Sequence, residues 1–243
     1  MPQRAREIAM NDETALLDRD RFASAADYAY AMLRREIVEG RFSPGRRMRE
    51  IELAQLLGIS RTPTRQALSR LEIEGLLDLR PRMGLVVSVL DEDAVEELYE
   101  MRAAVEGTAA AMAARHASPR DIALLTRLLE QEAALTPEPN ALYRHNRELH
   151  EAIHTAAHNR YLGKSLNALH DAIALLGPTT LAASGRPAIA HAEHAAIIQA
   201  IVERDDARAE RLAQAHILGA LEVRRGILER ERKRDRGGDS EGG

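Results

Sequence analysis

The chain has 243 residues, which is long enough for one small and one larger domain. Apolar residues make up 45% of it and aromatic residues only 3%, a balance that favours packed helices over sheets. The lack of cysteine excludes disulfide bonds and cysteine-based zinc sites, and the net charge of −4 argues against a uniformly basic nucleic-acid binder. No apolar run could span a membrane and no hydrophobic signal core is present, so we expect a cytoplasmic protein with no membrane partner.

Positive charge is concentrated in one part of the chain. From Arg41 to Arg82 there are nine arginines against five acidic residues. From Asp91 onward the balance reverses, with 19 basic and 25 acidic residues. A basic segment in an otherwise acidic chain is typical of a local phosphate-binding surface. We therefore expect any nucleic-acid contact to lie in the first third of the chain.

The first part of the chain predicts a tail followed by two helices. Residues 1–24 mix charges without a clear period, which indicates a flexible tail. Tyr28, Leu33 and Ile37 have helical spacing and indicate a first helix. A second, short helix is expected from Glu50 to Leu57. These two helices would contribute apolar side chains to one small core.

Residues 57–68 predict a tight turn followed by another helix. Gly58 permits the turn, and Ser60 can cap the helix that follows. Arg61 and Arg65 are four residues apart and therefore share one face of that helix. Two helices joined in this way form a helix-turn-helix, in which the second helix enters the major groove of DNA.

Two short strands with a basic turn between them come next. The strands are expected at residues 76–79 and 85–89, and residues 80–84 supply two arginines, a proline and a glycine for the turn. Such a hairpin forms a wing whose basic tip can lie on phosphates or enter the minor groove. The predicted order is therefore helix, helix, recognition helix, wing.

Over about residues 26–90 the sequence resembles the winged helix-turn-helix of the GntR family of bacterial transcription regulators. Matches to the family pattern are Arg61, Thr62, Pro63, Arg65, Ala67, Leu68, Arg70, Leu71, Glu72, Glu74, Gly75, Leu76 and Gly84. Thr64 and Gln66 depart from it, and Ile51 stands where several relatives have a DNA-contacting arginine. The resemblance implies double-stranded operator DNA as a partner. The residues expected to contact it are Arg49, Ser60, Arg61, Thr62, Thr64, Arg65, Arg70, Arg82 and Gly84.

The rest of the chain predicts a separate helical domain. We expect the winged domain at residues 25–92, a helical effector-binding and dimerisation domain at 93–228, and a disordered tail at 229–243. Six helical segments are separated by caps, glycines and prolines. They lie at about residues 93–116, from 119 onward, 143–158, 161–176, 186–204 and 206–229. The expected fold is thus mainly α, with an antiparallel bundle after the winged domain.

Histidines in this second domain have the spacing of a metal site. Asn146 and His150 are four residues apart on one helix. His194 and His216 each lie eleven residues from a predicted turn near Asp205, so an antiparallel hairpin would place them level. Three imidazoles and one amide oxygen suit a divalent ion, with zinc first and nickel or manganese as alternatives. The competing interpretation is a set of polar groups that are solvated or satisfied within the core.

Residues from about 95 to 225 also resemble the FCD domain, the all-helical effector domain of the FadR subfamily of GntR regulators. Its pattern has an Asp or Asn, a His four residues later, and one His on each of two late helices, which the four residues above match. The resemblance also implies a carboxylate-binding arginine on the first helix of the domain, at Arg102. An ion pair with Glu106 is the alternative role for that arginine. Tyr143 and His154 are further candidates for effector contact.

One motif offers an alternative from another class. Residues 150–154 fit the H-E-x-x-H pattern, in which two histidines bind zinc and a glutamate acts as general base. A peptidase would also need strands and a cleft, and an exposed Glu151 would argue against it. We therefore expect no enzyme, but a homodimeric, ligand-responsive regulator that senses a small carboxylate through a metal-containing cavity. A metal-free cavity is the alternative. His116, His145, His170 and His191 are expected at the surface or in packing.

Overall fold

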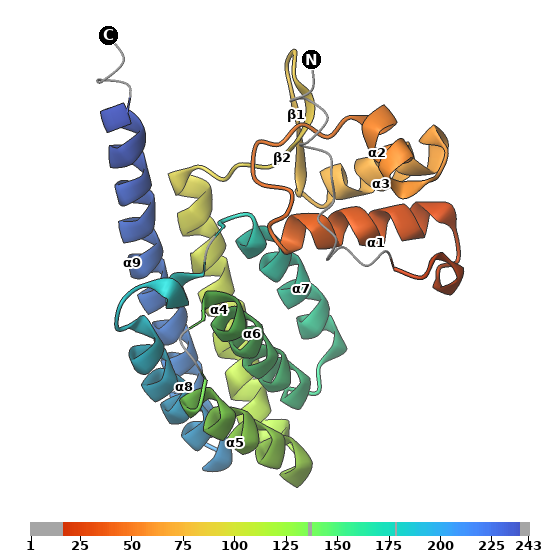
Figure 1. Cartoon of the computed structure of the whole chain (residues 1–243). Helices are drawn as coiled ribbons and strands as arrows, with labels where there is room; N and C mark the ends of the chain where they lie inside the picture. The colour runs from red at the N-terminus through yellow and green to blue at the C-terminus, as the bar shows by residue number, and fades with distance from the viewer. Residues whose placement is uncertain (1–16, 136–137, 178, 239–243) are drawn as a thin grey trace. The chain divides into compact units, whose positions relative to one another are not determined.

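The computed structural model describes residues 17–135, 138–177 and 179–238. They form two compact units, and the chain passes from the first to the second between Val89 and Leu90 (Figure 1). None of the helices in the described ranges combines the length and the apolar character that crossing a membrane requires. Each unit is described below on its own.

The first unit contains three helices and a two-stranded antiparallel sheet. The elements are α1 (Ala25–Val38), α2 (Glu50–Leu57), α3 (Arg61–Ile73), β1 (Leu77–Arg80) and β2 (Gly84–Val87). Ser24 caps α1 by accepting a hydrogen bond from the Asp27 backbone N–H. α3 packs on α1 around fully buried side chains that include Met32, Leu33 and Leu71. The helix-turn-helix and the hairpin therefore have the order that the sequence predicts.

Residues with positive φ shape the turns at both ends of the DNA-binding elements in this unit. Gly58 ends α2 at φ +64° and lets the chain enter α3 directly. The β1–β2 turn has Arg82 at φ +64° and Gly84 at φ +79°. Ser60 occupies the N-cap position of α3 as expected, but its side chain makes no capping bond. Instead the Ser60 carbonyl accepts a hydrogen bond from the Thr64 hydroxyl at 3.0 Å.

The second unit is a bundle of helices. They are α4 (Glu92–His116), α5 (Pro119–Ala133), α6 (Pro139–Ala156), α7 (Arg160–Ala174), α8 (Arg186–Val202) and α9 (Asp206–Gly238), with a 3-10 turn, η2 (Thr180–Ala182), before α8. α4 and α9 pack along much of their length (Figure 1). Gly107 makes this close approach possible, because a Cβ there would lie 2.6 Å from the Gln214 side chain. The expected helical bundle is confirmed.

The core of this bundle is built from small and branched apolar residues. Ala110, Ala113 and Ala114 of α4 are fully buried against the leucines of α5 and the isoleucines of α8. The chain turns sharply between Val202 and Asp206, close to the position expected from the sequence. α8 and α9 therefore run side by side as an antiparallel hairpin, which is the arrangement that brings His194 level with His216.

Two expectations about the ends of the chain differ from the structure. Residues 229–238 were expected to be disordered, but α9 continues to Gly238. Their Glu, Arg and Lys residues are strong helix formers, and Arg232 forms an ion pair with Glu92 of α4. The predicted N-terminal tail contains a 3-10 turn at Arg19–Arg21. Residues 1–16, 136–137, 178 and 239–243 lie outside the described residues.

Candidate functional site

The exposed face of α3 carries two arginines that share one carboxylate. The Arg61 side chain is 61% exposed and the Arg65 side chain 66% exposed. Arg61 Nε donates to Glu50 Oε1 at 2.7 Å, and Arg65 Nε donates to Glu50 Oε2 at 2.8 Å. These two hydrogen bonds lower the pKa of Glu50 to about 2, and the bond from Arg65 has the larger effect. Glu50 therefore stays ionised and holds both guanidinium groups at the start of α2.

Most of the other residues expected to contact DNA are exposed on this unit. Ser60, Thr62 and Arg82 are exposed, and Arg49 is exposed while pairing with Glu52 at 2.7 Å. Gly84 is half-buried in the wing. Arg70 is exposed but lies over the Tyr30 ring, 3.6 Å from its centroid, and pairs with Glu74.

Thr64 differs from the prediction. Its side chain has no exposed surface, and its hydroxyl donates to the Ser60 backbone within the unit. Ala67, Leu68 and Leu71 are buried on the same side of α3, three, four and seven residues later. Thr64 therefore belongs to the core face of the recognition helix and is not a direct DNA contact.

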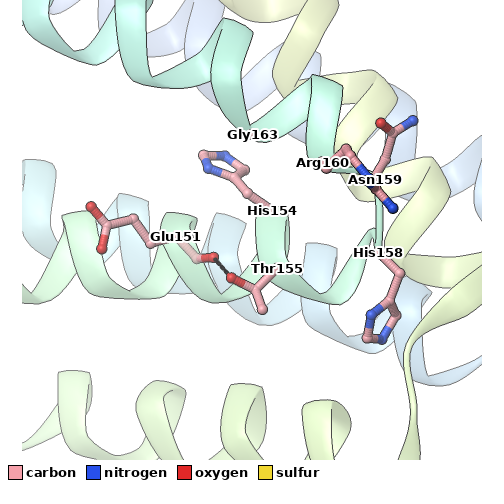
Figure 2. Close-up of a pocket in the computed structure, with 7 residues that line it drawn as sticks. All are labelled: Glu151, His154, Thr155, His158, Asn159, Arg160 and Gly163. Carbon is pink, nitrogen blue, oxygen red and sulfur yellow. Dashed lines mark hydrogen bonds between the residues drawn. The ribbon is translucent and has the colours of Figure 1, made fainter.

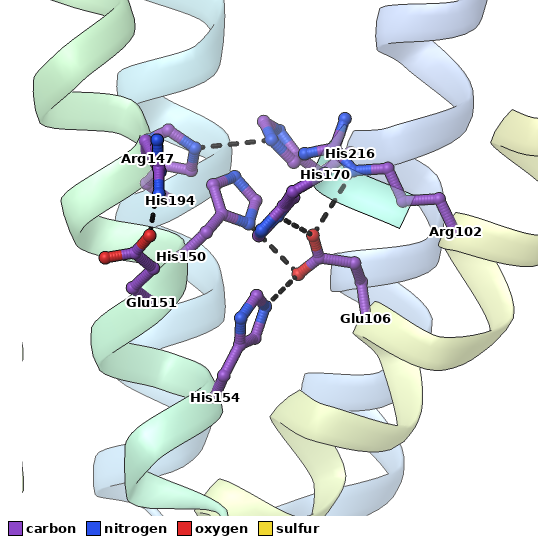
Figure 3. Close-up of polar contacts among 9 residues, drawn as sticks. All are labelled: Arg102, Glu106, Arg147, His150, Glu151, His154, His170, His194 and His216. Carbon is purple, nitrogen blue, oxygen red and sulfur yellow. Dashed lines mark hydrogen bonds and ion pairs between the residues drawn. The ribbon is translucent and has the colours of Figure 1, made fainter. Parts of the chain in front are cut away.

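In the second unit, three histidines from three helices converge. His150 of α6, His194 of α8 and His216 of α9 are all buried, and each offers one ring nitrogen within 4.8 Å of the others (Figure 3). His194 Nε2 and His216 Nε2 are 3.3 Å apart. His150 Nε2 is buried and has no hydrogen-bond partner among the described residues. We call these three residues the histidine triad.

A carboxylate orients each imidazole of the triad. Each Nδ1 faces a glutamate oxygen, so Nδ1 carries the proton and Nε2 keeps its lone pair. The lone pairs of His194 and His216 then point at each other, an arrangement that a bound cation would stabilise. The three contacts are His150–Glu106 at 3.1 Å, His194–Glu132 at 2.9 Å and His216–Glu193 at 2.7 Å.

The protonation states of the triad also suit a metal ligand set. Burial, partly opposed by the neighbouring Glu106, lowers the pKa of His150 to about 3. Burial likewise lowers the pKa of His216 to about 4. Both imidazoles are therefore neutral near pH 7, and neutral imidazole is the form that binds metal ions. The orphaned nitrogen, the facing lone pairs and the neutral rings together fit a divalent cation.

Beside the triad lies a small cavity with a volume of about 60 Å³. Asn146, His150 and His216 are among its lining residues, so three of the four predicted metal ligands line one cavity, and His194 is not among its lining residues. Its other polar lining residues are Tyr99, Arg102, Tyr143, Arg147, His170, Thr179, Thr180, Arg186 and Arg224. Arg102 and Tyr143, two of the residues predicted to contact an effector, therefore line the same cavity.

Arg102 forms the ion pair with Glu106 that the sequence analysis gives as its alternative role, and it also lines the cavity. Its side chain lines the cavity, and its Nε donates to Glu106 Oε1 at 3.2 Å. Glu106 also accepts hydrogen bonds from His150 and from His154, the latter at 2.7 Å (Figure 3). Burial raises the pKa of Glu106, but the contacts with the two imidazoles outweigh burial, and the pKa lies well below its usual range. An ionised Glu106 thus connects Arg102 to the triad.

His154 does not reach this cavity. It lines a separate surface hollow together with Glu151, Thr155, His158 and neighbouring residues (Figure 2). Glu151 is exposed and pairs with Arg147 at 2.8 Å. The second histidine of the H-E-x-x-H motif therefore binds Glu106, and the glutamate is directed to solvent, so the motif does not form a peptidase site.

Several residues of the site were missed from the sequence. His170 was expected at the surface or in packing, but it lines the cavity and lies 3.6 Å from Glu106. The orienting glutamates and the buried Arg186 were also missed. Glu193, the partner of His216, could have been suspected because it directly precedes His194 in the sequence. Glu132 could not, because it lies 62 residues before its partner His194. His145 is buried as expected, against the Leu128 carbonyl.

Comparison with known protein families agrees with this division into units. The profile described as "Bacterial regulatory proteins, gntR family" matches residues 25–87. The profile described as "FCD domain" matches residues 97–219, about half of the chain. The first match covers the helix-turn-helix and wing, and the second covers the helices that carry the triad.

Individual relatives extend over most of the chain. The uncharacterized HTH-type transcriptional regulator YdhC of Bacillus subtilis is 29% identical over 203 residues, which cover 82% of this chain and 91% of that protein. The probable D-xylose utilization operon transcriptional repressor of Paenarthrobacter nicotinovorans is 31% identical over 76% of this chain and 82% of its own length. The solved structure of E. coli McbR/YncC has the same fold, with a TM-score of 0.70 over 85% of this chain and all of its own, at 21% identity.

Proposed function

Because the chain belongs to the GntR family of transcription regulators, in the FadR-like subfamily with an FCD domain, we propose that it senses a small organic carboxylate through a metal-containing cavity. The two sequence relatives described above are named as transcription regulators, one of them as a probable repressor of an operon, and neither as an enzyme, so the chain is a DNA-binding regulator and not a peptidase. The observation that carries the proposal is the convergence of three carboxylate-oriented imidazoles beside a cavity lined by arginines.

The proposed metal ligands are Asn146 and the histidine triad. Nitrogen-rich sets of this kind suit zinc, with nickel or manganese as alternatives. When bound, the ion would supply a Lewis-acid position that accepts an anionic oxygen. The three glutamates behind the triad would hold the imidazoles in their ligating tautomer.

Arg102 is the proposed partner for the effector. Four neutral ligands give a divalent ion no directly bound negative charge, because the glutamates lie behind the imidazoles, so an anionic carboxylate would supply both an oxygen ligand and a directly bound negative charge. Arg102 lines the same cavity and can donate to a second carboxylate oxygen. Tyr143 lines the cavity as well and can add a hydrogen bond.

The effector would regulate transcription by changing the arrangement of the two DNA-binding units in a dimer. Proteins of this family are typically dimeric. A helix-turn-helix dimer reads two half-sites at a fixed spacing, so an effector that alters the spacing of the two heads alters operator affinity. Energetically, the effector shifts DNA binding only to the extent that it binds one arrangement of the dimer more tightly.

The proposal is tested by calorimetry with small carboxylates on metal-loaded and chelated protein. We expect binding that chelation abolishes, and a loss of roughly tenfold or more in affinity for Arg102→Ala, because a charged hydrogen bond is removed. Arg144→Ala is the matched control, since Arg144 lies exposed on α6 outside the cavity. Equal binding by both forms of the protein would replace the proposal with the metal-free regulator.

A separate prediction concerns Glu50, which holds both recognition-helix arginines. Glu50→Gln should raise affinity for non-specific duplex DNA several-fold, because it removes a negative charge near the phosphates and releases two guanidinium groups. The ratio of operator to non-specific affinity should fall, because the arginines lose their shared anchor. Filter binding over a series of salt concentrations measures both affinities.

Glu72→Gln is the control for that experiment, since Glu72 is an exposed acid of α3 in the same unit and its removal changes the net charge equally. We expect the Glu72 variant to raise non-specific affinity less than the Glu50 variant does. If the two variants behave alike, Glu50 acts only through its charge and does not position the arginines.

A further inference from the structure

The histidine triad is closed off from solvent. None of its three members is more than 5% exposed. The cavity beside it is lined by four arginines, and no acidic residue is among its lining residues within the described ranges. The four are Arg102, Arg147, Arg186 and Arg224, and the glutamates that pair with the first three do not line the cavity. A divalent cation that approached through this cavity would meet like charge, so the charges favour a different route to the triad.

A row of side chains of the metal-ligand type leads from the surface to the triad. His154 lines the surface hollow of Figure 2, and 8% of its side chain is exposed. Its Nε2 lies 2.7 Å from Glu106 Oε2, and His150 Nδ1 lies 3.1 Å from the same oxygen. Each of the three residues offers one ligand atom within 4.8 Å of the other two (Figure 3). We call His154, Glu106 and His150 the entry row.

Both imidazoles of the entry row have contacts on two sides. His154 contacts the surface hollow on one side and Glu106 on the other. His150 faces Glu106 through Nδ1, while its Nε2 is the triad nitrogen that has no hydrogen-bond partner among the described residues. A neutral imidazole presents either nitrogen as a ligand, depending on its tautomer. Since a bare ion in the protein interior is very costly, a row that exchanges ligands one at a time lowers the barrier to the buried triad.

Glu106 offers the entry row the oxygen that Arg102 does not contact. Arg102 Nε donates to Oε1 at 3.2 Å, and His170 Nε2 lies 3.6 Å from the same Oε1. Oε2 contacts the two imidazoles of the row. The hollow is also less cationic than the cavity, because its lining residues include one glutamate, Glu151, and one arginine, Arg160. Both observations favour this side of the triad for the approach of a cation.

We propose that His154 and Glu106 form an entry site, which takes a divalent cation from the surface hollow and passes it to the triad through His150. This inference rests on the proposed function, in which the triad holds the ion. The entry site is occupied only in passage, so it lowers the barrier between the free and the bound ion without changing either end state. It therefore sets how fast the ion is bound and released, and not how tightly the triad holds it.

The experiment measures how fast the metal-free full chain takes up zinc, with a fluorescent zinc indicator, and how fast the loaded chain loses zinc to excess chelator. His154→Gln removes the imidazole but keeps an N–H that can donate to Glu106. It should slow uptake and release by roughly tenfold or more, because the ion loses one ligand on its way, and leave zinc affinity unchanged. His158→Gln is the matched control, since His158 lines the same hollow but pairs with Asp121 at 2.9 Å. It should keep the wild-type rates.

A second pair of variants separates the ligand atom from the shape of the side chain. His154→Cys and His154→Ser have nearly the same size, but only the thiolate is a good zinc ligand. We expect the cysteine variant to take up zinc faster than the serine variant, and this comparison holds even if both melt below the wild type. Melting temperatures of the metal-free proteins show whether each variant keeps its fold.

Each remaining outcome decides against one claim. Wild-type rates in His154→Gln, or equal rates in the cysteine and serine variants, would overturn the entry site and leave the proposed function standing. Faster release with unchanged uptake would show that His154 only positions Glu106. Two zinc ions per wild-type chain, one of them lost in His154→Gln, would make the entry site a second resident site instead of a route. A wild-type chain that takes up no zinc at all would overturn the metal-dependent function together with the entry site.

Discussion

Replacing His194 by alanine should strip the second unit of its metal ion and lower its melting temperature by roughly 5–15 °C. His194 has no exposed surface, and its ring lies 4.6 Å from that of His216, measured between centroids. An ion held by the triad would tie α6, α8 and α9 together. A ligand at 100 to 1,000 times its dissociation constant stabilises the folded state by about 3–4 kcal/mol, which corresponds to this shift for a chain of this size.

The matched control is His191→Ala. His191 lies three residues earlier on α8 and contacts the same Glu132, at 3.0 Å, but it stands outside the triad. We expect this variant to keep about one ion per chain, whereas His194→Ala keeps none by elemental analysis. A chelator should lower the melting temperature of the wild type and of His191→Ala only. Wild-type protein that stays free of metal after zinc reconstitution would contradict the assignment.

Local signals explain why the helices and the pairing of two histidines could be predicted. Ser118 and Asp121 form the capping box that their spacing indicates, with bonds of 3.2 and 2.8 Å between side chains and backbone. The turn after Val202 follows from polar residues between two apolar patterns. Counting from that turn places His194 and His216 level, because an α-helix rises by a constant amount per residue.

The partners behind the triad could not be predicted, because they depend on how whole helices rotate against one another. Glu106 lies 44 residues before His150, and Glu132 lies 62 residues before His194. Periodicity identifies a buried face but not the side chain opposite it. Arg186 illustrates the limit further: an arginine beside a proline at a helix start suggests a solvated end, yet it is buried on Glu193.

The burial of Thr64 could have been predicted from the sequence. It precedes Ala67, Leu68 and Leu71 by three, four and seven residues, which is the spacing of one helix face. It was named among the expected DNA contacts, but a threonine can satisfy its hydroxyl on the carbonyl four residues earlier, as it does here on Ser60. The helix face on which Thr64 lies therefore predicts its burial better than its polar side chain does.

The opposite face of α3 gives the last prediction. Arg65→Ala should weaken operator binding by about 10- to 100-fold, because a good base contact is worth roughly 1–3 kcal/mol. The fold should be unchanged, since the side chain is 66% exposed and its ion pair with Glu50 is solvated. Circular dichroism and the melting temperature check the fold, and titration of DNA from upstream of the gene measures affinity.

Arg115→Ala is the control, because Arg115 is an exposed arginine of the second unit that pairs with Asp206. It removes the same charge and should leave operator affinity unchanged.

Arg61→Ala and the double variant complete a double-mutant cycle with Arg65→Ala. Since Glu50 contacts both arginines, removing one leaves the carboxylate free to hold the other more firmly, so the two losses should not add. An Arg65→Ala protein that binds operator DNA as the wild type does would show that another surface reads the sequence.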